Sequence, residues 1–163
     1  MKARIVEFII GNMGAGKTTL ARKLIDKGFV VLDNDYMREM LGCGKYIFSP
    51  ETEPIIKKIS MEFISELSAR NINFVIDGCM VTKALRAPII STIREESNYN
   101  GIKTVINARV LYVSKDVALK RRMKNPRGIS KEVWAEVWDK FNLKWQDPER
   151  SEGFDKIIKD GKL

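Results

Sequence analysis

The chain lacks histidine altogether and contains only two cysteines, Cys43 and Cys79, in 163 residues. Without histidine, a mixed Cys–His zinc site has no complete set of ligands, and no imidazole can serve as a general base. Two cysteines are also too few for a disulfide framework. These absences exclude zinc modules and disulfide-rich secreted domains, and they indicate a protein of the reducing cytoplasm.

Long apolar runs are absent too. No stretch approaches the roughly 20 apolar residues that a transmembrane helix needs, so we expect no membrane partner. The first residues, "MKARIVEFIIGNMGAGKTT", carry a basic residue and an apolar run but no small-residue cleavage site. We interpret them as a first β-strand and not as a signal peptide.

No internal repeat, low-complexity tract or linker interrupts the chain, and its length suits one domain, residues 1–163. The formal net charge is +8. A basic surface attracts polyanions such as nucleic acid, although it can also serve solubility alone. The same two readings, a polyanion contact and a solvated helix face, apply to the stretch richest in cations, which holds Lys115, Lys120, Arg121, Arg122, Lys124 and Arg127.

Short apolar runs alternate with helical patterns along the sequence. The runs predict buried strands at residues 4–10, 29–33, 73–77 and 104–113, and a final pattern at 154–160 predicts a terminal strand. Helices are expected at 17–27, 53–69, 82–98 and 130–145. Pro88 should kink or restart the third of these. The alternation predicts an α/β fold with a parallel sheet and helices on both faces, with ligands at the carboxyl ends of the strands.

The last of these helices is rich in tryptophan. Its apolar side chains could be taken for a base-stacking platform, but their helical spacing favours core packing. The stripe consists of Val133, Trp134, Val137, Trp138, Phe141 and Trp145.

A phosphate-binding loop (P-loop) follows the first predicted strand. The residues Gly11, Gly16, Lys17 and Thr18 fit the pattern G-x-x-x-x-G-K-[ST], and Gly14 adds a further hinge. The glycines let backbone N–H groups turn toward phosphate oxygens, and the helix that begins there adds its positive end. We expect Lys17 to reach the β- and γ-phosphates of ATP and the Thr18 hydroxyl to bind Mg²⁺.

The loop alone does not identify a reaction. GTPases are expected to carry an N-K-x-D tetrapeptide and a D-x-x-G switch, and the sequence contains neither in a suitable place. A signature of transport ATPases is also missing. Phosphoryl transfer to an acceptor remains, and the acceptor needs residues of its own.

Acidic residues end the next two predicted strands. Asp33 and Asp35 follow the second strand, with Arg38 three residues further on, and Asp77 ends the third strand. A kinase of hydroxyl groups needs a carboxylate near the attacking oxygen, and in a chain without histidine that base must come from this acidic set. The spacing of Asp35 and Arg38 puts both side chains on one face at the start of a helix.

These side chains suggest a division of labour. Asp35 would accept the proton while Arg38 holds an anionic acceptor or the reacting phosphate; a helix cap with a surface arginine is the structural alternative. Asp77 would hold the water shell of Mg²⁺ or the acceptor. A basic stretch with Pro126 and Gly128 predicts a lid at about 114–130, whose Arg122 and Arg127 would close over the phosphates.

Taken together, the chain resembles the kinase domain of 5′-hydroxyl polynucleotide kinases of phages and of DNA and RNA repair enzymes. The matching segments are "GNMGAGKTT", "DYMR", "VID", "LKRRMKNPRGIS" and "DPERSEGFDKI", in that order. The resemblance implies a three-layer P-loop kinase fold with a five-stranded parallel sheet and a helical lid. One departure is that "VIDGCMVT" lacks the polar residues that often follow the acid in that family.

The resemblance also implies roles for single residues. It makes Asp35 the general base, Arg38 the residue that holds the acceptor-side phosphate, Asp77 an acceptor-side acid and Arg127 the lid arginine. Lys17 and Thr18 become the phosphate and metal residues. The nucleotide site expected for ATP and Mg²⁺ then comprises Gly11, Asn12, Met13, Gly14, Ala15, Gly16, Lys17, Thr18, Thr19 and Arg122.

The leading hypothesis is therefore a stand-alone kinase that transfers the γ-phosphoryl group of ATP to a hydroxyl of DNA or RNA, foremost the 5′ end. If the protein is phage-encoded, its place would be the host cytoplasm. Three alternatives stay open. They are a small-molecule kinase acting on a nucleoside, nucleotide, sugar or antibiotic, a kinase of a hydroxymethylated base in DNA, and an ATP-gated nucleic-acid-binding module without enzymatic activity.

Overall fold

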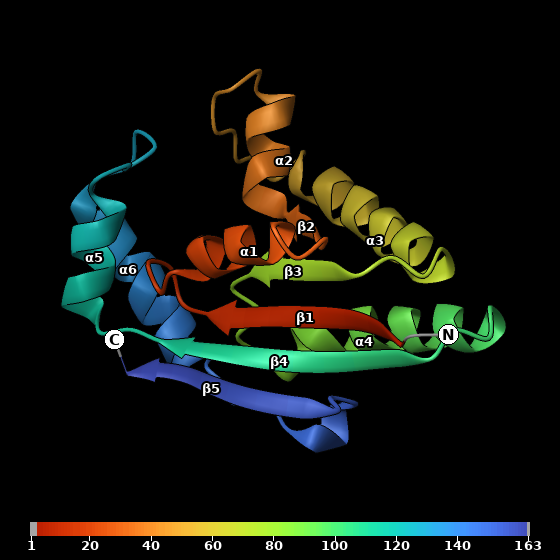
Figure 1. Ribbon diagram of the computed structural model, residues 1–163. Coiled ribbons are helices and arrows are strands. Elements are labelled where there is room, and N and C mark those ends of the chain that lie inside the picture. Colours follow the sequence, from red (N-terminus) through yellow and green to blue (C-terminus); the bar gives the residue numbers. More distant parts are fainter. Residues whose placement is uncertain (1–2, 163) are drawn as a thin grey trace.

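A five-stranded parallel sheet forms the centre of the computed structural model, which describes residues 3–162 (Figure 1). The strand order is β2-β3-β1-β4-β5, and all four neighbouring pairs are parallel. The predicted α/β fold with a five-stranded parallel sheet is thus confirmed. The strands are β1 (Arg4–Gly11), β2 (Val30–Asp33), β3 (Phe74–Gly78), β4 (Thr104–Tyr112) and β5 (Lys156–Lys162).

Helices cover both faces of this sheet. Leu24 of α1 packs on one face against Ile9 and Val75, whereas α3 and α4 pack on the opposite face, where Ile64 and Ile93 belong to the main core. The helices are α1 (Lys17–Ile25), α2 (Asn34–Leu41), α3 (Glu53–Ala69), α4 (Lys83–Tyr99), α5 (Lys115–Arg122) and α6 (Lys131–Leu143), with a 3₁₀ turn at Arg150–Glu152.

The strand residues explain why the sheet is buried. The sequence of β1, RIVEFIIG, is apolar on both faces, and Val6, Phe8, Ile9 and Ile10 are fully buried. Central strands of a parallel sheet have this pattern because helices cover both of their faces.

One prediction about a helix is wrong in part. The helix α4 runs through Pro88 from Lys83 to Tyr99, so the expected restart does not occur. Pro88 is the sixth residue of the helix and removes only one hydrogen bond, to the first turn. The buried side chains of Ile89, Ile90 and Ile93 anchor the helix on the sheet beyond it.

The tryptophan-rich helix α6 packs mainly on α5. Trp134 is 7% exposed and forms a small core with Leu119 of α5 and Met13 of the P-loop. Core packing is confirmed for Trp134, whereas Val133 is exposed. Trp145 lies beyond the end of α6 and packs against the main core.

All five strands point the same way, so their carboxyl ends share one edge of the sheet, on the left in Figure 1. The P-loop follows β1, α2 follows β2, and α5 and α6 stand beyond the same edge (Figure 1). The predicted site residues therefore meet at this edge. Within residues 3–162, no helix combines the length and apolar character needed to cross a membrane.

Candidate functional site

The P-loop turns sharply at two glycines. Gly14 and Gly16 have φ values of 72° and 93°, in the left-handed region that glycine adopts at little cost. Gly16 is the N-cap of α1 and offers no side chain to the first N–H groups of the helix. A Cβ atom at Gly16 would meet no atom within 4 Å apart from its chain neighbours, so no other segment packs on that side of the glycine. This cradle suits a phosphate group.

The side chains of the loop serve mainly to fix it. Asn12 donates to the Trp138 carbonyl oxygen (3.0 Å) and accepts a hydrogen bond from the Met13 N–H (2.7 Å). Met13 and Ala15 are buried in two separate apolar clusters. Of the expected nucleotide-binding residues, Asn12, Met13 and Ala15 thus have only backbone atoms to offer a ligand.

Contacts with α5 hold the other side of the loop. A Cβ atom at Gly14 would approach the backbone of Ala118 to 2.7 Å, so the two segments are in contact. The guanidinium of Arg121 also donates to the Gly14 carbonyl oxygen (2.9 Å). The sequence did not single out this role for Arg121, because nothing local links residues so far apart.

Lys17 projects across the mouth of the loop. Its ammonium group donates to the Asn12 carbonyl oxygen (3.0 Å) and lies 3.6 Å from the Cys79 sulfur. Thr18 is half-buried, whereas Thr19 is exposed. Cys79 is therefore an additional residue of the site, and its position two residues after Asp77 is the only sequence signal for it.

Two carboxylates meet at the ends of β2 and β3. Asp33 and Asp77 are direct partners in the strand register, and Asp77 is 5% exposed. Asp33 caps α2 by accepting the Asp35 N–H (2.8 Å). Burial and then the neighbouring charge of Asp77 raise the pKa of Asp33 to about 7. Burial also raises the pKa of Asp77, against the opposing effects of Lys17 and Thr18.

These residues fit Mg²⁺ and ATP. Oδ2 of Asp77 is buried and has no hydrogen-bond partner among residues 3–162, which is costly for a carboxylate unless a cation or donor completes it. No group of three or more acidic, cysteine or histidine residues in this part of the chain forms a dedicated metal cage. Mg²⁺ typically needs only one or two protein oxygens beside phosphates and water, as Asp77 and Thr18 offer.

Asp35 and Arg38 lie on one face of α2, as expected from their spacing. The Asp35 carboxylate accepts hydrogen bonds from Arg38 Nη1 at Oδ1 and from Arg127 Nη1 at Oδ2, both at 2.7 Å. Burial raises the pKa of Asp35, but the hydrogen bond and charge of Arg127 and the charge of Arg38 outweigh it and lower the pKa. Asp35 is thus ionised at neutral pH.

Three further residues surround this pair. Arg38 binds both oxygens of Glu53 on α3 (2.7 Å each), and this bond raises its pKa. Arg127 reaches Glu39 (3.2 Å) and lies 4.3 Å above the Tyr46 ring. The Tyr46 hydroxyl donates to Asp35 Oδ1 (3.2 Å). No local pattern in the sequence predicted Glu39, Tyr46 or Glu53, because these contacts join separate segments of the chain.

Arg122 occupies a different position from Arg127. Its guanidinium stacks 4.5 Å from the Trp134 ring, and its Nε atom is buried without a hydrogen-bond partner among residues 3–162. Burial and then the charge of Arg127 lower its pKa. Lys17, Asp35, Arg38, Asp77, Arg122 and Arg127 all belong to segments that meet at the carboxyl edge of the sheet.

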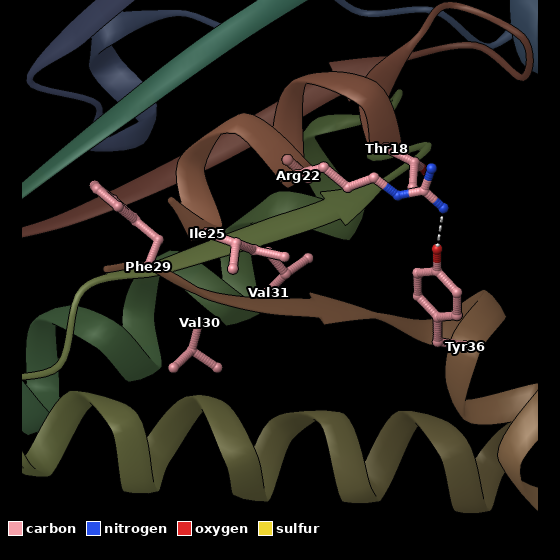
Figure 2. A pocket seen from close by; sticks show the side chains of 8 residues that line it. Thr18, Arg22, Ile25, Phe29, Val30, Val31 and Tyr36 are labelled. Atoms are coloured by element: carbon pink, nitrogen blue, oxygen red, sulfur yellow. Dashed lines mark hydrogen bonds between the residues drawn. The ribbon is translucent and has the colours of Figure 1, made fainter. Parts of the chain in front are cut away.

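Two grooves adjoin this edge. One, of about 410 Å³, runs between α1 and β2 and is mostly apolar; Figure 2 shows Ile25 and Val31 along it. At one end the Tyr36 hydroxyl accepts a hydrogen bond from Arg22 (2.9 Å), the dashed line in Figure 2. The other groove, of about 470 Å³, lies between the end of α2 and the α5–α6 loop.

Several solved structures share this fold. A chain of the Pnkp1/Rnl/Hen1 RNA repair complex is 20% identical with a TM-score of 0.65, over 90% of this chain and 47% of that chain. This protein thus spans about half of the length of that relative. A fungal RNA kinase is 15% identical with a TM-score of 0.63, over 99% of this chain and 78% of that chain.

Small-molecule kinases share the fold as well. Shikimate kinase from Acinetobacter baumannii is 22% identical with a TM-score of 0.59, over 99% of this chain and 86% of that chain. No curated protein matches the sequence significantly. A family model described as an AAA domain, however, matches residues 6–148. The chain therefore belongs to this AAA domain family, as a P-loop domain with a kinase-like α/β fold.

Proposed function

We propose that this protein transfers the γ-phosphoryl group of ATP to a hydroxyl of a nucleic acid, at the 5′ end of DNA or RNA. The observation that carries the proposal is the Asp35 carboxylate. It is ionised and is held by Arg38 and Arg127 at the carboxyl edge of the sheet, where the P-loop also lies. A kinase needs a base and cations beside the acceptor.

Each residue has one task in this proposal. ATP and Mg²⁺, when bound, supply the phosphoryl group and part of the positive charge that offsets it. Lys17 and the P-loop N–H groups hold the β- and γ-phosphates, and Thr18 and Asp77 offer oxygens to the metal. Asp35 orients the acceptor hydroxyl and takes its proton at Oδ1 or Oδ2 as the oxygen attacks.

The two arginines contribute charge. Arg38 has a planar fork whose pairing with both oxygens of Glu53 is the geometry that a phosphate would also accept. We assign Arg38 to a phosphate next to the acceptor hydroxyl. Arg127 and Arg122, on the proposed lid at about 114–130, would stabilise negative charge on the transferred group.

The net charge supports a nucleic-acid acceptor. The net charge is +8, which favours a polyanion, and two of the similar structures are an RNA repair complex and an RNA kinase. A small-molecule acceptor is the second candidate, because the match to shikimate kinase covers 86% of that enzyme and 99% of this chain. At these identities the likeness concerns the fold and does not separate the two acceptors.

A direct assay distinguishes them. The protein is incubated with labelled ATP and Mg²⁺, and with 5′-hydroxyl oligonucleotides of DNA and RNA, in parallel with nucleosides, nucleotides and sugars. We expect label at the 5′ end of the oligonucleotides, removable by a phosphatase. Label only on a small hydroxyl compound would replace the proposed function by the second candidate. The Lys17→Ala variant, which should transfer no phosphoryl group because it lacks the ammonium group at the β- and γ-phosphates, serves as the negative control.

A further inference from the structure

The loop between α2 and α3 has a conformation fixed by its own backbone. The N–H groups of Gly42, Cys43 and Gly44 bond back to carbonyl oxygens of α2, and Cys43 and Gly44 are left-handed, with φ values of 52° and 89°. A Cβ atom at Gly42 would lie only 1.9 Å from the Lys45 carbonyl oxygen, so glycine is needed at that tight turn. The turn brings the residues after it back onto the face of α2 that carries Arg38.

Two aromatic rings follow this turn and contact the site. The Tyr46 ring centroid lies 4.3 Å from the Arg127 guanidinium and 5.8 Å from that of Arg38, and the exposure of Tyr46 is intermediate. Phe48 lies 5.5 Å from the Arg38 guanidinium, yet it is 66% exposed. An aromatic ring that rests on a guanidinium and keeps most of its surface in solvent has a free face for a flat partner.

Cations line the groove next to these rings. Lys45, Asn125 and Arg127 line it together with Tyr46, and the volume is about 470 Å³. Lys45, and Lys124 directly before Asn125 in the sequence, are exposed and make no ion pair with any of residues 3–162. Glu39, the carboxylate of the groove, is paired with Arg127 (3.2 Å). The free charge of the groove is thus positive, which suits a phosphate backbone.

We propose that this loop and groove bind the single-stranded end of the acceptor, with the base of a terminal nucleotide on Phe48 and its downstream phosphates beside Lys45 and Lys124. This inference rests on the proposed function and specifies its substrate: a strand, not a lone nucleotide or sugar. Proteins that bind single strands combine an aromatic platform with a basic groove in this way. A small acceptor would leave both the ring and the lysines without a partner.

Binding of a strand that cannot react tests the inference apart from catalysis. A fluorescent single-stranded oligonucleotide with a 5′-phosphate is titrated with each variant, and anisotropy is followed. Phe48→Ala should weaken binding by about tenfold or more, the usual effect of losing one stacked base. Phe48→Trp should keep affinity, whereas Phe48→Leu, which still covers Arg38, should lose it. Lys45→Ala should lower the slope of log affinity against log salt by about 0.7.

Matched controls come from the far edge of the sheet. Tyr99, at the end of α4, is 90% exposed, and Lys103 precedes β4. Tyr99→Ala and Lys103→Ala should leave affinity within the error of the assay. Thermal unfolding of each variant identifies losses of affinity that come from misfolding. If Phe48→Ala is misfolded, the comparison of strand affinity between Phe48→Leu and Phe48→Trp tests the role of the ring.

The outcomes separate the two proposals. If the native protein phosphorylates 5′-hydroxyl oligonucleotides but Phe48→Leu and Lys45→Ala bind strands as the controls do, the groove assignment is wrong and the proposed function stands. If the native protein binds no strand and phosphorylates only small hydroxyl compounds, both are wrong. Selective loss in the Phe48 and Lys45 variants, together with transfer to the 5′ end, supports both.

Discussion

Asp35 is the residue with the most demanding surroundings, because both of its carboxylate oxygens are already bonded. Arg38 and Tyr46 donate to Oδ1, and Arg127 donates to Oδ2. These donors keep the carboxylate ionised, and they also compete with an acceptor hydroxyl for its lone pairs. Oδ1 accepts from two donors and Oδ2 from one, so an acceptor hydroxyl can bind at the remaining lone pair of Oδ2 without displacing a donor.

Replacing Asp35 by asparagine tests its role as the base. Asp35→Asn keeps the shape but removes the proton acceptor, so turnover should fall roughly 10²–10⁴-fold with little change in ATP affinity. Single-turnover phosphoryl transfer and nucleotide titration measure the two effects. Asp26→Asn, at an exposed position after α1, is the control. Near-native turnover of Asp35→Asn would move the base to Asp33 or Asp77.

Arg38 should act on the acceptor and not on ATP. Arg38→Lys keeps a charge but loses the planar fork. It should therefore slow phosphorylation of a nucleoside 3′-phosphate about tenfold more than phosphorylation of the bare nucleoside. Steady-state kinetics with both acceptors provide the comparison. Equal slowing of both acceptors would mean that Arg38 contacts the transferred phosphate instead.

Asp33 links stability to pH. Its pKa is about 7 in the folded protein and about 4 in an unfolded chain, so between these values the folded state holds a proton that the unfolded state has lost. Stability should therefore fall as pH rises through this window. Asp33→Asn stays neutral and keeps the helix cap. Without Mg²⁺, the free energy of unfolding of this variant, relative to that of the native protein, should therefore increase by about 1–2 kcal/mol from pH 4 to pH 8. Denaturant titrations at both pH values measure it; a constant difference would contradict the assignment.

At the scale of elements, the local patterns predicted most of the fold. Apolar runs located all five strands within two residues at every end, since a buried parallel strand must be apolar on both faces. The P-loop required a strand before it and a helix after it, and both are present. Pro88 misled the prediction because packing of α4 on the sheet outweighed a local preference.

The site was predictable only where its residues are neighbours in sequence. Asp35 and Arg38 contact each other because helical spacing requires it. The bond between Arg127 and Asp35 joins residues 92 positions apart, and Glu53 reaches Arg38 from another helix. Such contacts depend on how α2, α3 and the α5–α6 loop pack, and no periodicity in the sequence encodes that packing.

The contact between the P-loop and α5 leads to a prediction about Gly14. Gly14→Ala introduces a Cβ atom 2.7 Å from the Ala118 backbone at a left-handed φ of 72°. Gly28→Ala is a matched control, since Gly28 has a φ of 83° and no atom within 4 Å of its Cβ position. Both should lose about 1 kcal/mol to the backbone, and Gly14→Ala about 1–3 kcal/mol more from the clash. Denaturant unfolding measures the loss of stability in both variants. Equal losses would show that α5 moves away from the added Cβ atom at no cost.

At the scale of the whole molecule, the basic side chains fall into two groups, those with contacts inside the protein and those exposed without an ion pair. Part of the basic stretch is structural, because Lys115 pairs with Asp139, Arg121 holds Gly14 and Arg122 rests on Trp134. Lys120 and Lys124 stay exposed without an ion pair among residues 3–162. Lys115, Arg121 and Arg122 thus have structural contacts that neither reading of the stretch included, and contact of the exposed lysines with a polyanion stays a prediction.

The dependence of acceptor affinity on salt follows from this charge. If the acceptor is a strand, log affinity should fall linearly with log salt, with a slope of about −0.7 for each phosphate contact. Lys124→Glu should make this slope shallower and reduce affinity more than turnover, whereas Lys27→Glu, at the exposed end of α1 away from the groove, should change neither. The Michaelis constant for an oligonucleotide, measured over a series of salt concentrations, checks both points. If the Michaelis constant of the native protein does not change with salt, the bound acceptor carries few phosphates. The charge of +8 would then serve solubility alone.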